Sequence, residues 1–176
     1  MGRATITRDD WELLRLAPLS VGLGIIAADP AGPEVMEREI DRLRVMLHTT
    51  AGADRRDLVH EVAASLVAGS GNDRLPPRWS ERDPASARAD AAAEAVRVCR
   101  RVTEVLHQRA SIEEDLAFRR WLYDLARGVA RATRKQAFLG LIGGSVVTPA
   151  EQHELDALAA ALELELDLRS GVVLRV

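Results

Sequence analysis

The sequence predicts an all-α fold, a single compact bundle of about six helices in two loosely similar helix-loop-helix halves. Apolar residues form 47% of the 176-residue chain and aromatic residues only 3%, so small aliphatic side chains supply the core. Apolar positions also recur with helical spacing between clear start signals. Finally, residues 23–47 recur in outline at 138–162, pairing Glu39, Asp41, Leu43 and Leu47 with Glu154, Asp156, Leu158 and Leu162.

Bulk properties exclude several classes of protein. With a net charge of -3, the chain lacks the excess of basic residues that is typical of a nucleic-acid binder. Cys99 is the single cysteine, so an intrachain disulfide and a cysteine-rich metal site are excluded and a reducing compartment is favoured. The longest apolar run, 16–28, is shorter than the roughly 18 to 20 residues of a membrane span, so we expect a buried helix. With no recognisable signal peptide, we expect a cytoplasmic protein without a membrane contact.

The first helix is predicted to start after Thr7, whose hydroxyl can cap it, and to run to about Ala28. It is apolar on nearly all sides, which indicates a central element packed by several neighbours. Pro18 removes a backbone hydrogen bond, and Gly22 and Gly24 remove bulk. We therefore expect a kink or very close helix packing there.

The second helix begins at Pro33, which suits a first helical turn, and continues to about Thr49. A third helix is expected over roughly 53–68. Residues 69–82 contain Gly, Ser, Asn and two prolines and are predicted to be a loop.

Start signals mark the remaining three helices. Asp83-Pro84 opens the fourth, which runs to about Ala110 with an apolar stripe of Val98, Cys99, Val102 and Leu106. Ser111 with Glu114 forms a capping box for the fifth, whose stripe is Phe118, Trp121, Leu122, Leu125 and Val129. Thr148 with Glu151 forms another box, opening a sixth helix to about Leu162.

The C-terminal residues change their pattern. Charged and apolar residues alternate over 162–169, and Ser170-Gly171 separates them from a short apolar run. This pattern indicates a short β-hairpin, the alternative being a sixth helix that continues through Leu166. The predicted organisation is a helical domain at 1–162 and a tail or hairpin at 163–176.

Patterns for metal and nucleophilic catalysis are incomplete. A di-iron bundle needs Glu-x-x-His pairs facing the core, but Glu104 and His107 point away from their helix's apolar stripe. Asp57 and His60 likewise fall outside the apolar face. Cys99 lies on an apolar face, where a thiol is inert. We therefore expect a protein without catalytic activity, bound metal or cofactor.

Arginines line one face of the fifth helix, within about 60° of one another. The row consists of Arg120, Arg127, Arg131 and Arg134. Such a ridge could meet phosphates or an acidic partner. Asp124 interrupts it and can pair with Arg120 or Arg127, which favours a solvated face.

A ligand pocket is a second candidate. Helices that carry proline and glycine leave room for a cavity between the first helix and the fifth and sixth. Its predicted lining is Pro18, Gly22 and Trp121, with the loop residues Gly143, Gly144 and Ser145. Few polar groups are expected inside, so its ligand would be largely apolar.

Val147-Thr148-Pro149-Ala150-Glu151 marks a helix start in the second half of the chain, and Ala28-Asp29 followed by Gly32 marks a loop in the first half. The first segment resembles the second-half helix start of tellurite-resistance TerB-like domains, and the second resembles their first-half loop. This chain departs from the family pattern at two places. Gly144 stands where the second loop has an acidic residue, and Pro33 to Met36 lack the Ser or Thr and the Glu of the first-half helix start. The resemblance implies an all-helical, stress-associated accessory domain with cation-binding loop acids. Only Asp29 carries over, and one carboxylate cannot form a calcium-type site.

Three function classes follow. A helical accessory or interaction protein is favoured, with self-association or partner binding dependent on residues 163–176. A binder of a small apolar ligand is the alternative. Nucleic-acid binding through the arginine ridge is third.

Overall fold

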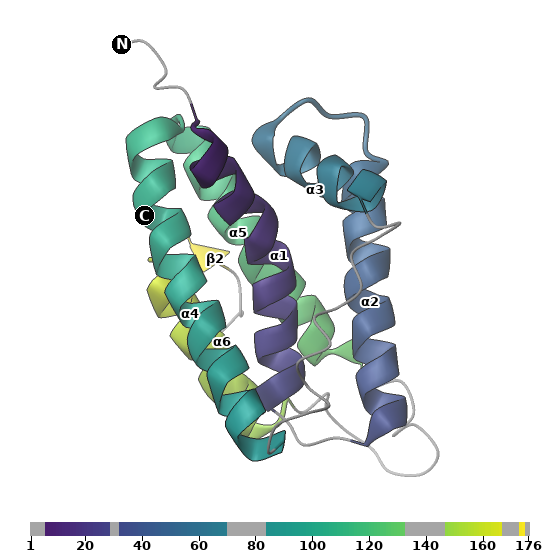
Figure 1. The fold of residues 1–176 in the computed structure, drawn as a ribbon. Helices are drawn as coiled ribbons and strands as arrows, with labels where there is room; N and C mark the ends of the chain where they lie inside the picture. The colour runs from purple at the N-terminus through teal and green to yellow at the C-terminus, as the bar shows by residue number, and fades with distance from the viewer. Residues whose placement is uncertain (1–5, 29–31, 70–83, 133–146, 167–172, 175–176) are drawn as a thin grey trace.

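A computed structural model gives the structure of residues 6–28, 32–69, 84–132, 147–166 and 173–174. The described residues form a bundle of six helices, which confirms the predicted all-α class (Figure 1). The helices are α1 Arg8–Ala28, α2 Pro33–Ala51, α3 Leu58–Gly69, α4 Pro84–Arg109, α5 Ile112–Ala130 and α6 Pro149–Ala161.

Reciprocal capping boxes start three of these helices. At α5, the Ser111 hydroxyl accepts from the Glu114 N–H at 3.3 Å, and the Glu114 carboxylate accepts from the Ser111 N–H at 3.2 Å. Thr148 and Glu151 make the same exchange at α6. At α1, Thr7 exchanges its two bonds with Asp10, both at 3.1 Å. The predicted starts of these helices are confirmed.

The predicted start of α3 at residue 53 is wrong. The helix begins at Leu58, because the Asp57 carboxylate accepts from the backbone N–H of His60 at 2.9 Å and so caps the first turn. Residues 52–57 instead turn the chain out of α2. Gly52 follows α2, and its N–H donates to the His48 carbonyl at 2.9 Å.

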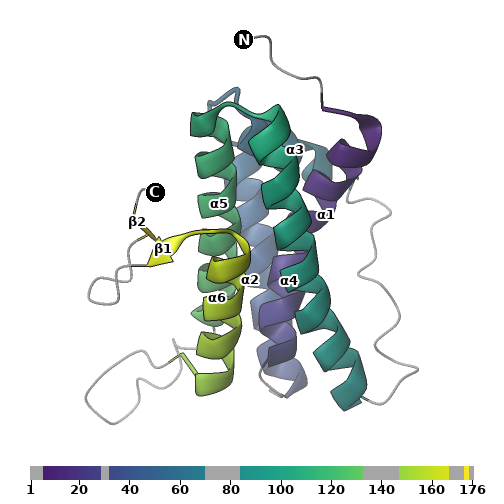
Figure 2. The same ribbon diagram turned by 90° about the vertical axis from the view of Figure 1, so that its left-hand side faces the viewer.

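Helix α1 is the central element. It packs chiefly along α4 and also contacts α5, α6, α2 and α3 (Figures 1 and 2). Among the described residues, it is the one helix long and apolar enough to cross a membrane, with a mean hydropathy of 1.4, but 61% of that window is buried inside the bundle. The expected buried core helix is therefore observed.

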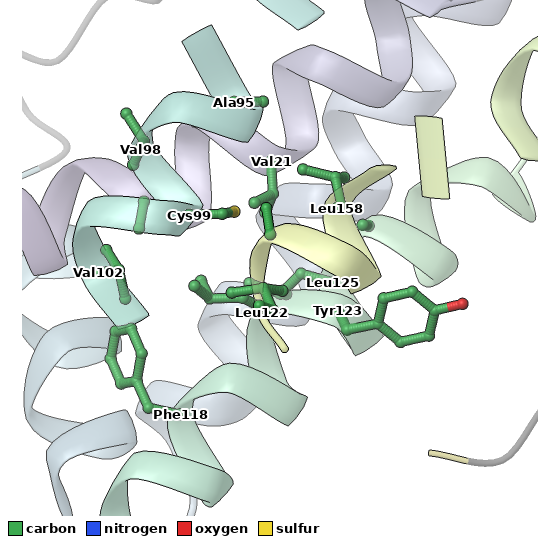
Figure 3. Packing of buried hydrophobic residues seen from close by; sticks show 14 of the residues in the cluster. Val21, Ala95, Val98, Cys99, Val102, Phe118, Leu122, Tyr123, Leu125 and Leu158 are labelled. Atoms are coloured by element: carbon green, nitrogen blue, oxygen red, sulfur yellow. The ribbon is translucent and has the colours of Figure 1, made fainter. Parts of the chain in front are cut away.

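The core lies where the predicted apolar stripes meet. Cys99 of α4 points toward Val21 of α1, with Leu122 and Leu125 of α5 and Leu158 of α6 nearby (Figure 3). Val102 of α4 lies beside Phe118 of α5, and Val98 belongs to the same buried cluster. Phe118, Leu122 and Leu125 are fully buried. These stripes fix the rotation of each helix about its axis, and with it the side chains left outside.

Two glycines bring α1 close to its neighbours. A Cβ atom added at Gly24 would lie only 2.7 Å from the Cβ of Ala95 on α4. A Cβ added at Gly22 would overlap the side chain of Leu43 on α2. The expected close packing at these glycines is confirmed.

The sequence echo has a structural counterpart. Leu43 and Leu47 of α2 are buried, and so are their partners Leu158 and Leu162, whereas Asp41 and Asp156 are both exposed. The glutamates agree as well, because Glu39 is 2% exposed and Glu154 is 7% exposed. Helices α2 and α6 therefore use the same positions to pack in the two halves.

A buried ion pair holds the end of α6. Arg119 donates to both carboxylate oxygens of Asp115, at 2.7 and 2.8 Å. Its Nη1 also donates to the carbonyls of Leu162 at 2.8 Å and Glu163 at 3.2 Å. We call this arrangement the Arg119 clamp. Glu163, with a φ of 49°, then turns the chain out of the helix.

Beyond the clamp, two short strands pair as the predicted hairpin requires, and the connection between them at 167–172 lies outside the described residues. Strand β1, Glu165–Leu166, pairs antiparallel with β2, Val173–Leu174, so that Glu165 lies opposite Leu174. The period change in the sequence therefore marks a real change of structure.

The close packing at Gly24 yields a first prediction. Gly24→Ala should lower the free energy of unfolding by about 1 to 3 kcal/mol, because Ala95 is short and rigid and α1 and α4 must separate. Gly22→Ala should cost less, since the Leu43 side chain can rotate away. Urea unfolding of both variants checks this. An equal or larger loss for Gly22→Ala would contradict it.

Glu154 yields a second prediction. Burial raises its pKa from the ordinary 4.5, although His153 opposes this, and Oε1 has no hydrogen-bond partner in the described part of the chain. The folded protein therefore binds the proton more tightly than the unfolded chain. The contribution of Glu154 to the free energy of unfolding is therefore most favourable below pH 4.5, the pKa in the unfolded chain. This contribution is lost as the pH rises through the higher pKa of Glu154 in the folded protein.

Glu154→Gln removes this titration. Its stability relative to the wild-type protein should increase from pH 4.5 upward, by at most about 1.4 kcal/mol per pH unit, and then level off. Urea unfolding at pH 4 to 8 measures the difference. Glu37→Gln on the exposed face of α2 removes the same charge and is the control. A pH-independent difference between Glu154→Gln and the wild-type protein would refute the assignment.

Candidate functional site

A cleft lies at the end of the bundle where α1, α3 and α5 begin and α4 ends. Its volume is about 530 Å³, within the usual range of small-molecule sites. We call it the end cleft. Its charged lining residues are Arg8, Arg56, Arg109, Asp57, Glu61 and Glu114, and Ile6, Thr7, Trp11 and Leu58 complete the lining.

Helix starts position these side chains. The Thr7–Asp10 capping box fixes the entry into α1, which places Arg8 in the first turn and Trp11 one turn further on. Asp57 caps α3, which starts at Leu58, so Arg56 lies immediately before the capping residue. Arg109 is the last residue of α4.

Most acidic groups near the cleft are engaged within the protein. Asp57 is bound by Arg55 at 2.5 Å, and Glu114 belongs to the α5 capping box. Asp10 lies 3.7 Å from Arg109. Burial opposes ionisation of Asp57, but the His60 N–H and Arg55 prevail and lower its pKa. These carboxylates therefore serve local structure.

Arg8 and Arg56 differ from Arg109. Both are exposed, and neither has a carboxylate partner in the part of the chain that the structure describes. Glu61 is the cleft's opposing exposed carboxylate. Three arginines and three carboxylates line the cleft, so its formal charges balance. Arg8 and Arg56 are the two arginines without a carboxylate partner in the described residues, and α1, α3 and α5 direct the positive ends of their dipoles toward this end of the bundle.

The lining defines what the end cleft can bind. Guanidinium groups bind phosphate and carboxylate through paired N–H donors. The half-buried Trp11, with Ile6 and the buried Leu58, supplies an apolar surface beside them. Among the described residues, no group of three or more His, Cys, Asp or Glu side chains could hold a metal ion. The arrangement is suited to holding an anion with an apolar body.

The sequence-predicted ligand pocket is only partly described. Gly22 faces Leu43 of α2, and Trp121 also faces α2, because its Nε1 donates to the Thr50 hydroxyl at 3.3 Å. The Trp121 ring meets Phe118 edge-on, with 5.3 Å between centroids. Pro18 is buried in α1. Gly143, Gly144 and Ser145 lie outside the described residues.

The arginine ridge is a mixed-charge cluster. Arg120 and Arg127 are half-buried and Arg131 is exposed, while Arg134 lies outside the described residues. Desolvation raises the pKa of Asp124, and Arg127, Arg120 and Arg131 oppose that rise, which places the carboxylate among them as expected. Each of these three arginines has an interaction partner, so the row is not a bare cationic surface.

The other candidates occupy the places that the helical pattern predicts. Glu104 and His107 are exposed, and His107 lies 3.4 Å from the Asp115 carboxylate. His60 is half-buried beside the Asp57 cap. Cys99 is fully buried, and burial, followed by nearby Glu154, raises its pKa to about 12. The predicted buried position of the Cys99 thiol is confirmed.

Sequence reasoning missed the end cleft. One local signal was present, because Asp57 is a good cap and would have placed Arg56 at a helix start. The meeting of α1, α3 and α5 at one end depends on how the helices pack. Spacing within a single helix does not carry that information.

Comparison of the chain with protein-family models, with curated proteins and with solved structures finds no match.

Proposed function

We propose that this chain is a non-catalytic helical accessory protein that acts by binding, and that the end cleft holds a small organic anion. The observation that carries the proposal is the pairing of Arg8 and Arg56 with the apolar surface of Trp11 in one 530 Å³ cleft. The resemblance to TerB-like domains supports an accessory role. A cytoplasmic location agrees with the single buried cysteine.

The ligand class follows from the lining. A phosphate or carboxylate would meet the guanidinium groups, and an aromatic or short aliphatic body would cover Trp11, Ile6 and Leu58. The sequence alone suggested a largely apolar ligand at another place. Because charged side chains line the end cleft, the proposed ligand is amphipathic.

Phenyl phosphate tests this proposal, because it joins a phosphate to one aromatic ring. It should quench Trp11 fluorescence and bind more tightly than phenol or inorganic phosphate alone. Arg8→Ala with Arg56→Ala should weaken binding by about 10- to 100-fold through loss of two charge-assisted contacts. Fluorescence titration and calorimetry measure both effects.

Arg42→Ala with Arg101→Ala is the matched control. It removes two exposed arginines that lie outside the cleft, so it should leave the affinity for phenyl phosphate unchanged. Equal losses of affinity in the two double variants would show that only net charge matters and would reject the proposed site. A complete lack of phenyl phosphate binding would also reject it.

Self-association through the C-terminal hairpin is the second proposed activity. In the described residues, β1 and β2 pair only with each other, so the sheet has two edges. A lone hairpin is marginal in water, and an open edge accepts a strand from another chain. The Arg119 clamp holds the base of this hairpin. A second copy of this chain is the proposed partner.

Removal of residues 167–176 tests the proposal without touching the clamp. The full chain should be dimeric in size-exclusion chromatography with light scattering, and the shortened chain should be monomeric. Val173→Pro removes one backbone donor from β2, so it should also raise the proportion of monomer. A full-length chain that stays monomeric at about 100 μM, well above typical dimer affinities, would argue against self-association.

A further inference from the structure

A groove separates α4 from α6 on a different face of the bundle from the end cleft. Its volume is about 390 Å³. Ala92, Ala93 and Val96 of α4 give it a shallow apolar floor. Arg97 and Arg100 of α4 and Glu154 of α6 supply its polar groups. We call it the α4/α6 groove.

Glu154 is the unusual member of this lining. Its residue is 7% exposed, and its Oε1 atom is buried without a hydrogen-bond partner in the described part of the chain. Oε1 is turned toward Gly24 of α1, because a Cβ atom added there would sit 3.4 Å from it. A buried carboxyl oxygen without a donor is costly to the folded protein, so a rotation of the Glu154 side chain toward a donor in the groove would relieve that cost.

The arginines are not equivalent. Arg97 forms an ion pair with Glu94 one turn back along α4. Arg100 is exposed and has no acidic partner among the described residues. It lies one turn from Val96 on the same face of α4, so its guanidinium group is available to an anion at the groove.

We propose that the α4/α6 groove binds a small zwitterionic amino acid, whose ammonium group donates to Glu154 and whose carboxylate accepts from Arg100. The apolar floor then faces a short methylene spacer. A simple cation would meet repulsion from Arg97 and Arg100, and a simple anion would meet repulsion from Glu154. A molecule with both charges matches the acidic and basic groups that line the groove together.

The site is separate from the end cleft, and each can exist without the other. An ammonium group beside Glu154 would also offset the burial that raises the pKa of this carboxyl. Binding would therefore stabilise the folded chain, since the ligand has no comparable partner in the unfolded chain.

Glycine, β-alanine and γ-aminobutyrate test the proposal, because they differ only in the length of the spacer. Propionate and propylamine carry one charge each and serve as comparison compounds. At about 50 mM, one of the three amino acids should raise the Tm of the wild-type protein by about 2 °C or more. Propionate and propylamine should give less than half of that rise. Saturation-transfer NMR should detect the same amino acid bound.

Three variants test whether the amino acid binds at the α4/α6 groove. Glu154→Gln keeps the size of the side chain and should weaken binding about tenfold or more. Arg100→Ala should do the same from the surface of α4, where folding is not at risk. Arg101→Ala removes the neighbouring exposed arginine, which does not line the groove, and should leave binding intact.

Two results would overturn the proposal. One is the absence of both a Tm rise and an NMR signal with all three amino acids. The other is a rise of equal size in Glu154→Gln and Arg100→Ala, which would identify a general solvent effect. A rise in the wild-type and Arg101→Ala proteins that is lost in the other two variants supports it.

Discussion

The close approach of α1 to its neighbours is the constraint on which the bundle depends. Helix α1 contacts all five other helices of the described structure, and Gly24 allows its backbone to approach Ala95 of α4. Close backbone contact increases dispersion attraction, but it leaves little freedom to shift one helix alone. The positions of the helix ends follow from this packing. The end cleft exists because α1, α3 and α5 begin at the same end of α4.

Two buried polar groups in the second half of the chain play unequal parts in the bundle. The Arg119 clamp satisfies both members of its ion pair and two backbone carbonyls at the end of α6. Removing one partner of such a pair would leave a buried charge without compensation. Glu154 lacks that compensation at Oε1. The clamp is therefore satisfied within the fold, whereas Glu154 keeps an acceptor that no described group satisfies.

Local patterns predicted most of the fold because caps and apolar stripes are local chemistry. The capping boxes at Ser111 and Thr148 mark the residues at which α5 and α6 begin. The apolar stripe through Phe118 and Leu122 identifies the buried face of α5. The start of α3 was missed because a turn over 52–57 competes with the helical pattern. The cleft and groove were missed for another reason. Each joins residues from different helices, and one sequence does not give the distances between them.

The packing around α1 also bears on where this protein can hold a ligand. Gly22 leaves space in α1, yet the buried Leu43 occupies that space from α2. A small residue in a helix therefore marks close packing here. The end cleft and the α4/α6 groove both lie at the periphery, where side chains from different helices diverge. The guanidinium groups that we propose as binding groups belong to the exposed Arg8, Arg56 and Arg100. A ligand bound there would displace water from charges already in place, so its selectivity would depend on matching charge to charge over a short apolar contact.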